Sequence, residues 1–207
     1  MKNISSRLYN IIIGLLLLYG FGINYAMVQT IDPTFITGTT AYILFLLIYF
    51  GCCFLGIYLV HHTNTYIGFI GYNLIVVPFG VVINMFVSHY NQNLVENAVL
   101  LTGITTGVMC VAGTMFPNFF KSIISGLTCA LIACIIAECI GAFIFSMNFM
   151  FMDWIVALIF CGYIGYDWGK ANSDDKTINN AIKNSAKLYM DIINLFVRIL
   201  SIIGNKK

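Results

Sequence analysis

Residues 188–196 read Leu-Tyr-Met-Asp-Ile-Ile-Asn-Leu-Phe, an apolar segment with an aspartate, Asp191, near its middle. The preceding apolar segment ends in Gly-Tyr-Ile-Gly-Tyr-Asp-Trp-Gly, residues 162–169, and contains a second aspartate, Asp167. A carboxylate that faces lipid costs about 2.5 to 3.5 kcal/mol on insertion scales, so an acid inside a membrane span is a functional candidate. The two aspartates are therefore the first candidates for a site.

The composition of the chain indicates an integral membrane protein. Its 207 residues are 60% hydrophobic and 9% charged, with a mean hydropathy of +0.91, whereas a soluble domain carries about 25% charged residues. The lipid bilayer is thus the expected partner, and a net charge of +2 is too small to suggest nucleic acid. The first apolar run is interpreted as a span, not a cleaved signal, because six more such runs follow it.

Seven segments of the chain are long enough to cross a membrane, which takes about 20 mostly apolar residues. The predicted spans are 8–28, 38–60, 66–88, 95–116, 121–141, 147–168 and 185–204. The sizeable polar segment from Lys170 to Lys183 is expected to connect the last two spans. Because the other connections are short, we expect an all-α protein with one polytopic membrane domain over residues 1–207.

The basic residues predict an orientation. With the N-terminus inside, seven lysines and arginines lie on the inner side and three on the outer side. The inner ones are Lys2, Arg7, Lys121, Lys170, Lys176, Lys183 and Lys187, and the outer ones are Arg198, Lys206 and Lys207. The positive-inside rule then predicts a multi-pass protein of the cell membrane with a cytoplasmic N-terminus and an outer C-terminus. In a eukaryotic host an internal membrane is expected instead.

The two aspartates are expected to lie at similar depths. Asp167 is near the inner end of the span 147–168, and Asp191 is about six residues into the span 185–204, roughly 9 Å at 1.5 Å per residue. Two close carboxylates cannot both ionise cheaply, so a pair that meets in the inner third of the membrane shares a proton. Such a pair is a pH-sensitive latch, a cation site or a catalytic dyad.

One face of the last span is polar along its length. Lys187, Asp191, Asn194 and Arg198 follow at offsets of four, three and four, which places them on one helical face. Since that face cannot all point at lipid, we expect a bundle around a central seventh helix, with this face inward. In the other interpretation Lys187 reaches the interface and Arg198 pairs with an acid on a neighbouring helix.

Three further acids, Glu96, Glu138 and Asp153, are expected near helix ends on the outer side. Either each reaches interfacial water, or together they form an outer mouth that attracts cations.

A proline, Pro78, lies in the middle of the span 66–88 and should kink it. Asn73 and Asn84 share a face with the kink. This polar stripe either lines a water path or forms hydrogen bonds between helices.

The seven cysteines all lie in apolar runs, and none forms Cys-x-x-Cys. We interpret them as small buried apolar side chains and expect no metal site, the alternative being a metal or disulfide role. They are Cys52, Cys53, Cys110, Cys129, Cys134, Cys139 and Cys161.

The segment 188–196, with the run that follows it to Gly204, resembles the last helix of the Bax inhibitor-1-like proteins. Asp167, 24 positions before Asp191, and the stretch 102–116 are similar to the same family. The resemblance covers the seven-span layout and implies a bundle around a central seventh helix. It also implies a pH-sensitive calcium leak with Asp167 and Asp191 as the sensor. We expect no cofactor, and calcium or another cation as the permeant ion.

The chain departs from the family in two places. Bacterial relatives place an arginine near the second connection, where this chain reads His61-His62-Thr-Asn-Thr65, and they carry a basic residue where this chain has Ser201. The latch is then expected to use His61, His62 or Lys187, or no basic residue. A histidine titrates near 6.5, so either one could supply positive charge in acid; the alternative is that both are solvated loop residues.

Two other function classes remain open. Some members of the family are described as non-transporting regulators that bind other membrane proteins, such as proteases or cell-death factors. An intramembrane aspartyl protease also carries Tyr-Asp, as in Tyr166-Asp167, but Leu-Tyr-Met precedes Asp191 where Gly-x-Gly is required, and no Pro-Ala-Leu follows. We therefore expect no enzyme and no catalytic residues.

Overall fold

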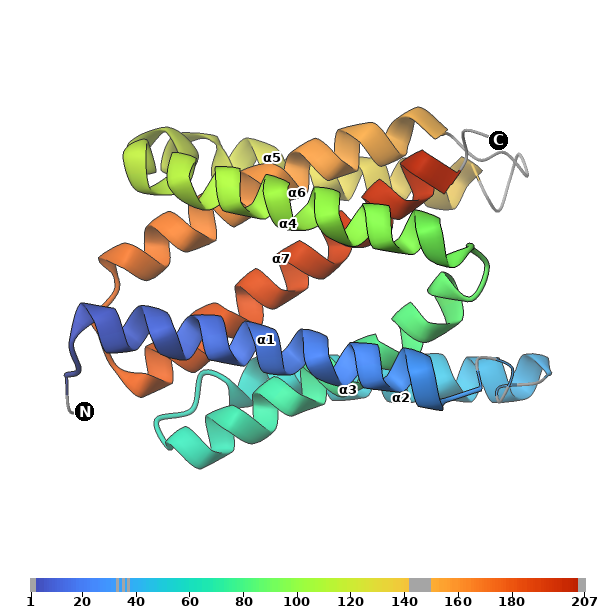
Figure 1. The fold of residues 1–207 in the computed structure, drawn as a ribbon, viewed down its shortest axis with the longest axis horizontal. Coiled ribbons are helices and arrows are strands. Elements are labelled where there is room, and N and C mark those ends of the chain that lie inside the picture. The colour runs from blue at the N-terminus through green and yellow to red at the C-terminus, as the bar shows by residue number, and fades with distance from the viewer. Residues whose placement is uncertain (1–2, 33, 35, 37, 142–149, 205–207) are drawn as a thin grey trace. The chain divides into compact units, whose positions relative to one another are not determined.

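The computed structural model describes residues 3–32, 34, 36, 38–141 and 150–204 (Figure 1). These residues form seven α-helices, which confirms the predicted all-α class. The helices are α1 (Ser6–Thr30), α2 (Thr39–Leu59), α3 (Thr65–Val87), α4 (Gln92–Met115), α5 (Pro117–Ile140), α6 (Met150–Ser173) and α7 (Ile178–Gly204). Among the predicted features, Lys2, Lys206, Lys207 and residues 147–149 lie outside the described residues.

Five helices of the described chain, α1 to α5, are long and apolar enough to cross a membrane. The other two, α6 and α7, hold the aspartates Asp167 and Asp191.

The chain divides into two compact units, and the boundary falls within α7. The first unit contains α1, α2, α3 and α7 up to Tyr189, and the second contains α4, α5, α6 and α7 from Met190. Both the part of α7 in the first unit and the part in the second contain buried residues, from Ala181 to Leu200. The single membrane domain expected from the sequence stays a prediction.

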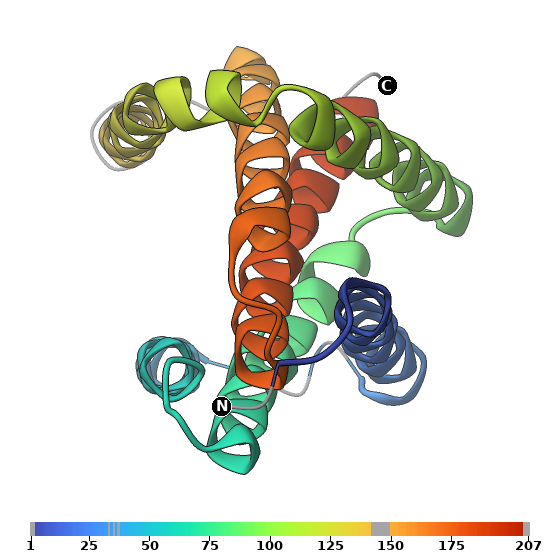
Figure 2. The same ribbon diagram turned by 90° about the vertical axis from the view of Figure 1, so that its left-hand side faces the viewer.

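In the first unit α3 packs against both α1 and α2, which lie on opposite sides of it (Figure 2). Glycines let the backbones of α2 and α3 touch, because a Cβ added at Gly71 would lie 2.8 Å from the carbonyl oxygen of Gly56.

The polar stripe beside Pro78 forms hydrogen bonds between α1 and α3. Asn73 accepts a hydrogen bond of 2.8 Å from the hydroxyl of Tyr19, and Asn84 donates one of 3.0 Å to the carbonyl of Ile31, which caps α1. Of the two interpretations of the stripe, the structure shows the inter-helix hydrogen bonds.

In the second unit α6 packs between α4 and α5 (Figure 2). On one side, Gly113 of α4 lies against the backbone of Gly165 in α6, where a Cβ would overlap the Gly165 carbonyl oxygen. On the other side, Cys134 of α5 packs with Val156 and Ile159 of α6 in an apolar cluster. Cys134 is thus a buried apolar side chain as expected, whereas Cys129 and Cys139 on the same helix are exposed.

The connection between the last two helices is shorter than the sequence suggests. The prediction of a polar connection from Lys170 to Lys183 is wrong, since α6 continues to Ser173 and α7 begins at Ile178. The hydroxyl of Thr177 accepts a hydrogen bond of 3.2 Å from the backbone nitrogen of Asn180, the arrangement of a helix N-cap. Hydropathy failed here because it does not register polar side chains that are satisfied by partners.

In the first turn of α7, the side chain of Asn179 forms hydrogen bonds to the turn between α2 and α3. Asn179 donates hydrogen bonds to the carbonyls of His62 and Thr63 and accepts one of 2.6 Å from the hydroxyl of Thr65. The half-buried side chain of Asn179 thereby joins the start of α7 to the α2–α3 turn.

Candidate functional site

The two aspartates are both buried in the second unit. Asp167, on α6, is 9% exposed, and Asp191, on α7, is 8% exposed. Each takes part in a polar interaction. A buried carboxylate is stable only when it is neutral, hydrogen-bonded or paired, so both residues meet the physical requirement for a site built on titrating acids.

The structure changes the residue count on which the expected depth of these two residues rests. Asp167 is followed by six more residues of α6, but Asp191 is thirteen residues from the start of α7, not six. At 1.5 Å per residue these positions are roughly 9 Å and 20 Å from the turn between the helices. The count of six is wrong because the first turns of α7 are polar and hydropathy does not mark them as part of the span. A direct contact between the two carboxyls stays a prediction.

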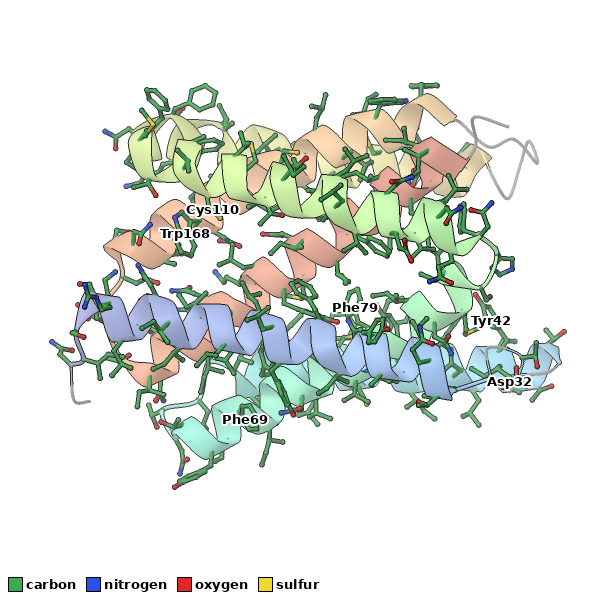
Figure 3. All side chains as sticks on the ribbon, viewed as in Figure 1. Asp32, Tyr42, Phe69, Phe79, Cys110 and Trp168 are labelled. Atoms are coloured by element: carbon green, nitrogen blue, oxygen red, sulfur yellow. The ribbon has the colours of Figure 1, made fainter. Side chains whose placement is uncertain are left out.

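The turn of α6 that carries Asp167 is held closely by α4. Trp168, labelled in Figure 3, donates a hydrogen bond of 2.9 Å from its Nε1 to the hydroxyl of Thr114. A Cβ at Gly169 would lie 3.0 Å from the carbonyl oxygen of Gly113. These contacts fix the rotation of α6 about its axis and therefore the direction of the Asp167 side chain. Thr114 was not singled out from the sequence, where an isolated threonine carries no signal.

The neighbours of Asp191 along α7 differ in their hydrogen bonds and in their burial. Asn194, one turn later, donates a hydrogen bond of 2.7 Å to the carbonyl of Met190, which is a local bond within α7. Lys187, one turn earlier, is half-buried and belongs to the first unit. Tyr189, two residues before Asp191, is fully buried. Its hydroxyl accepts a hydrogen bond of 2.5 Å from Asn24 and contacts the carbonyl of Val76.

A second polar cluster surrounds Arg198, three residues before Ser201 on α7. The guanidinium donates hydrogen bonds to Glu138 of α5 through its two terminal nitrogens, Nη1 and Nη2, at 2.6 and 2.9 Å. Its Nη1 also lies 2.7 Å from Asp153 of α6. The hydroxyl of Ser201 donates a hydrogen bond of 2.6 Å to the other oxygen of Asp153. Of the two interpretations of the polar face, the structure shows Arg198 paired with acids on neighbouring helices.

The three outer acids therefore differ. Glu138 and Asp153 are ion-paired, whereas Glu96 accepts a local hydrogen bond of 2.8 Å from Gln92 on an exposed turn of α4. The outer mouth that these acids could form stays a prediction. The sequence could not reveal the pairing, because no spacing relates residues on three different helices.

The two histidines form local contacts in the turn after α2. The Nδ1 of His61 lies 2.8 Å from the carbonyl oxygen of Ile57, and the Nδ1 of His62 accepts a hydrogen bond of 3.0 Å from the backbone nitrogen of Asn64. Both side chains are exposed, as in the interpretation of solvated loop residues. An interaction of either histidine with Asp167 or Asp191 stays a prediction.

Among the described residues, no group of three or more histidine, cysteine, aspartate or glutamate side chains could hold a metal ion. The candidate site therefore consists of Asp167 and Asp191, and the cluster around Arg198 lies further along α7.

The chain matches one family model over its whole length. The model is that of the Bax1-I family, described as inhibitor of apoptosis-promoting Bax1, and it covers residues 1–207. No curated protein matches the chain. A match of this extent, together with seven helices and the aspartates on α6 and α7, agrees with the resemblance found in residues 188–196. The chain is a multi-pass membrane protein that belongs to the Bax inhibitor-1 family.

Proposed function

We propose that this protein is a pH-sensitive leak for cations, and that Asp167 and Asp191 are its sensor. The observation that carries the proposal is the burial of two carboxyl groups, 9% and 8% exposed, on consecutive helices of one compact unit. In a membrane protein such groups are costly and mark ion or proton pathways. The family of the chain and the polar surroundings of both helices support this assignment.

The gating follows from the charge on the two carboxyl groups. In acid the groups share a proton or are both neutral, and α6 and α7 stay together. When both groups ionise at higher pH, their like charges repel, and an approach to about 4 Å would give a repulsion of roughly 4 kcal/mol at an effective dielectric constant of 20. That energy is enough to shift an equilibrium between two helix arrangements by about a thousandfold. The leak therefore opens as the pH rises through the titration of the pair.

Calcium is the cation that best fits the available ligands. Carboxylate and amide oxygens are hard donors, which calcium prefers, and Asp191 is followed by Asn194 on the same helical face. In the proposed orientation the N-terminus is cytoplasmic and the C-terminus is outside, in the cell membrane or in an internal membrane of a eukaryotic host.

The test is calcium flux into liposomes that contain the purified protein and a calcium-sensitive dye, between about pH 5 and 8. Wild-type protein should leak more at the higher pH. Asp167→Asn and Asp191→Asn should each flatten the pH dependence, because each removes one titrating group. Glu96→Gln is the matched control, since this exposed acid has a local hydrogen bond and should leave the profile unchanged. Flux equal to that of empty vesicles at every pH would refute the leak and favour the alternative of a non-transporting regulator.

A further inference from the structure

One guanidinium joins three helices of the second unit. Glu138 lies two residues before the end of α5, Asp153 lies three residues after the start of α6, and Arg198 lies on α7. Glu138 is held through both of its oxygens, at 2.6 and 2.9 Å, by the two terminal nitrogens of Arg198. Such a paired geometry is the strongest form of arginine–carboxylate contact.

Asp153 completes the cluster from the other side. Its Oδ1 lies 2.7 Å from the same Nη1 atom that contacts Glu138, and its Oδ2 accepts the hydrogen bond from Ser201. Two carboxylates therefore share one positive charge and lie close to each other. Removing the guanidinium would leave two facing negative charges in a partly buried place, where the Asp153 side chain is 13% exposed.

The helices that carry Glu138 and Asp153, α5 and α6, also pack against each other through an apolar cluster. Cys134 and Leu131 of α5 pack with Val156, Ile159 and Phe160 of α6 in one cluster. This cluster does not include α7. The ends of α5 and α6 can therefore stay together when the ionic contacts to α7 are broken.

The cluster is also distant from the aspartate pair along both helices. Arg198 is seven residues beyond Asp191 on α7, about 10 Å, and Asp153 is fourteen residues before Asp167 on α6, about 21 Å. The two groups of charges are thus separate elements of one unit.

We propose that Arg198, Glu138, Asp153 and Ser201 form an ionic strap that locks the paired ends of α5 and α6 onto α7. The strap is a second lock, in addition to the aspartate pair, and it has to open before the ends of α5 and α6 move away from α7. Its existence does not depend on cation flux, whereas its effect on flux rests on the proposed function.

The test is hydrogen–deuterium exchange of the full chain in lipid nanodiscs, followed by mass spectrometry. In Arg198→Gln, backbone amides around Glu138 and Asp153 should exchange about tenfold faster or more, which corresponds to a loss of about 1.4 kcal/mol of local stability. Amides of α1, α2 and α3 should be unchanged. Asn194→Ala is the matched control, because it removes a local hydrogen bond one turn earlier on α7 and should leave α5 and α6 unchanged.

A second variant separates the strap from a general packing role. Arg198→Gln combined with Glu138→Gln and Asp153→Asn removes the facing charges and should return exchange most of the way to that of the wild type. Arg198→Lys should be intermediate, since one ammonium cannot hold Glu138 by two bonds. Unchanged exchange in Arg198→Gln would overturn the proposal, and so would equal loosening of all helices that the triple variant does not reverse.

Flux measurements then distinguish this proposal from the leak itself. If the strap and the leak are both right, Arg198→Gln should increase calcium flux several-fold at every pH and retain its pH dependence. Faster exchange without any flux in wild type or variant would retain the strap and reject the leak. Flux in the wild type with unchanged exchange in Arg198→Gln would retain the leak and reject the strap.

Discussion

The amide of Asn184 in α7 donates a hydrogen bond of 2.7 Å to the hydroxyl of Tyr9 in α1, and both side chains are almost fully buried, at 1% and 0% exposed. The same amide donates a second hydrogen bond of 3.0 Å to Asp174 in the turn before α7. Asn184 therefore holds the start of α7 to α1 and to its own connection at once.

Replacing this amide should destabilise the first unit. Asn184→Leu retains the volume but leaves the hydroxyl of Tyr9 and the carboxylate of Asp174 without their donor, at a cost of about 1–3 kcal/mol. The melting temperature in detergent should fall by about 2–4 °C for each kcal/mol. Asn180→Ala, which removes an exposed hydrogen bond to the carbonyl of Asp175, should shift it by much less. Equal shifts in the two variants would show that burial at Asn184 is unimportant.

The glycines of α4 allow a comparison of two positions on one helix. Gly113→Ala should destabilise the protein by about 1–3 kcal/mol, because the new Cβ overlaps the backbone of Gly165 and forces α4 and α6 apart. Gly103→Ala meets nothing within 4 Å and should be neutral or stabilising by up to about 1 kcal/mol. Thermal unfolding of the two variants beside the wild type decides this, and a reversed order would contradict the close approach of α4 and α6.

The hydroxyl of Tyr189 gives a third test. Tyr189→Phe keeps the ring, which stacks on Phe21 with centroids 5.5 Å apart, but removes the acceptor of the Asn24 amide. A buried amide without its acceptor should cost about 1–3 kcal/mol. Tyr163→Phe is the control, because its hydroxyl bonds Thr128 at an exposed position and its loss should cost less than about 1 kcal/mol. Chemical denaturation with a fluorescence readout measures both values.

The histidines after α2 should not contribute to the pH response. His61→Gln combined with His62→Gln should leave the pH profile of calcium flux unchanged, because both side chains are exposed and their contacts are local. The expectation from the sequence, a broader response in which a protonated histidine attracts an aspartate, requires the opposite result. A narrower profile in the double variant would support that expectation.

The sequence predicted the apolar helices closely because hydropathy alone determines them. The expected spans 38–60 and 66–88 differ from α2 and α3 by one residue at each end. The start of α7 was missed because the buried Asn184 resembles a loop residue until its partners are known.

For the candidate site, the residue types were predictable and their partners were not. An aspartate in an apolar segment is recognisable in any single sequence, so Asp167 and Asp191 were found at once. The acids that pair with Arg198 lie 60 and 45 positions away, at Glu138 and Asp153. Helical periodicity relates residues within one helix and gives no register between helices.

Because α7 supplies residues to both compact units, neither unit has all its helices before α7 has been synthesised. At a translation rate of about 5–20 residues per second, α1 spends roughly ten seconds or more in the membrane before Asn184 reaches its Tyr9. During that time the polar groups of Tyr9 and Asn24, which α7 later satisfies, are open to lipid or to the insertion machinery. A nascent chain that ends before α7 therefore leaves the hydroxyl of Tyr9 and the amide of Asn24 without these hydrogen-bond partners.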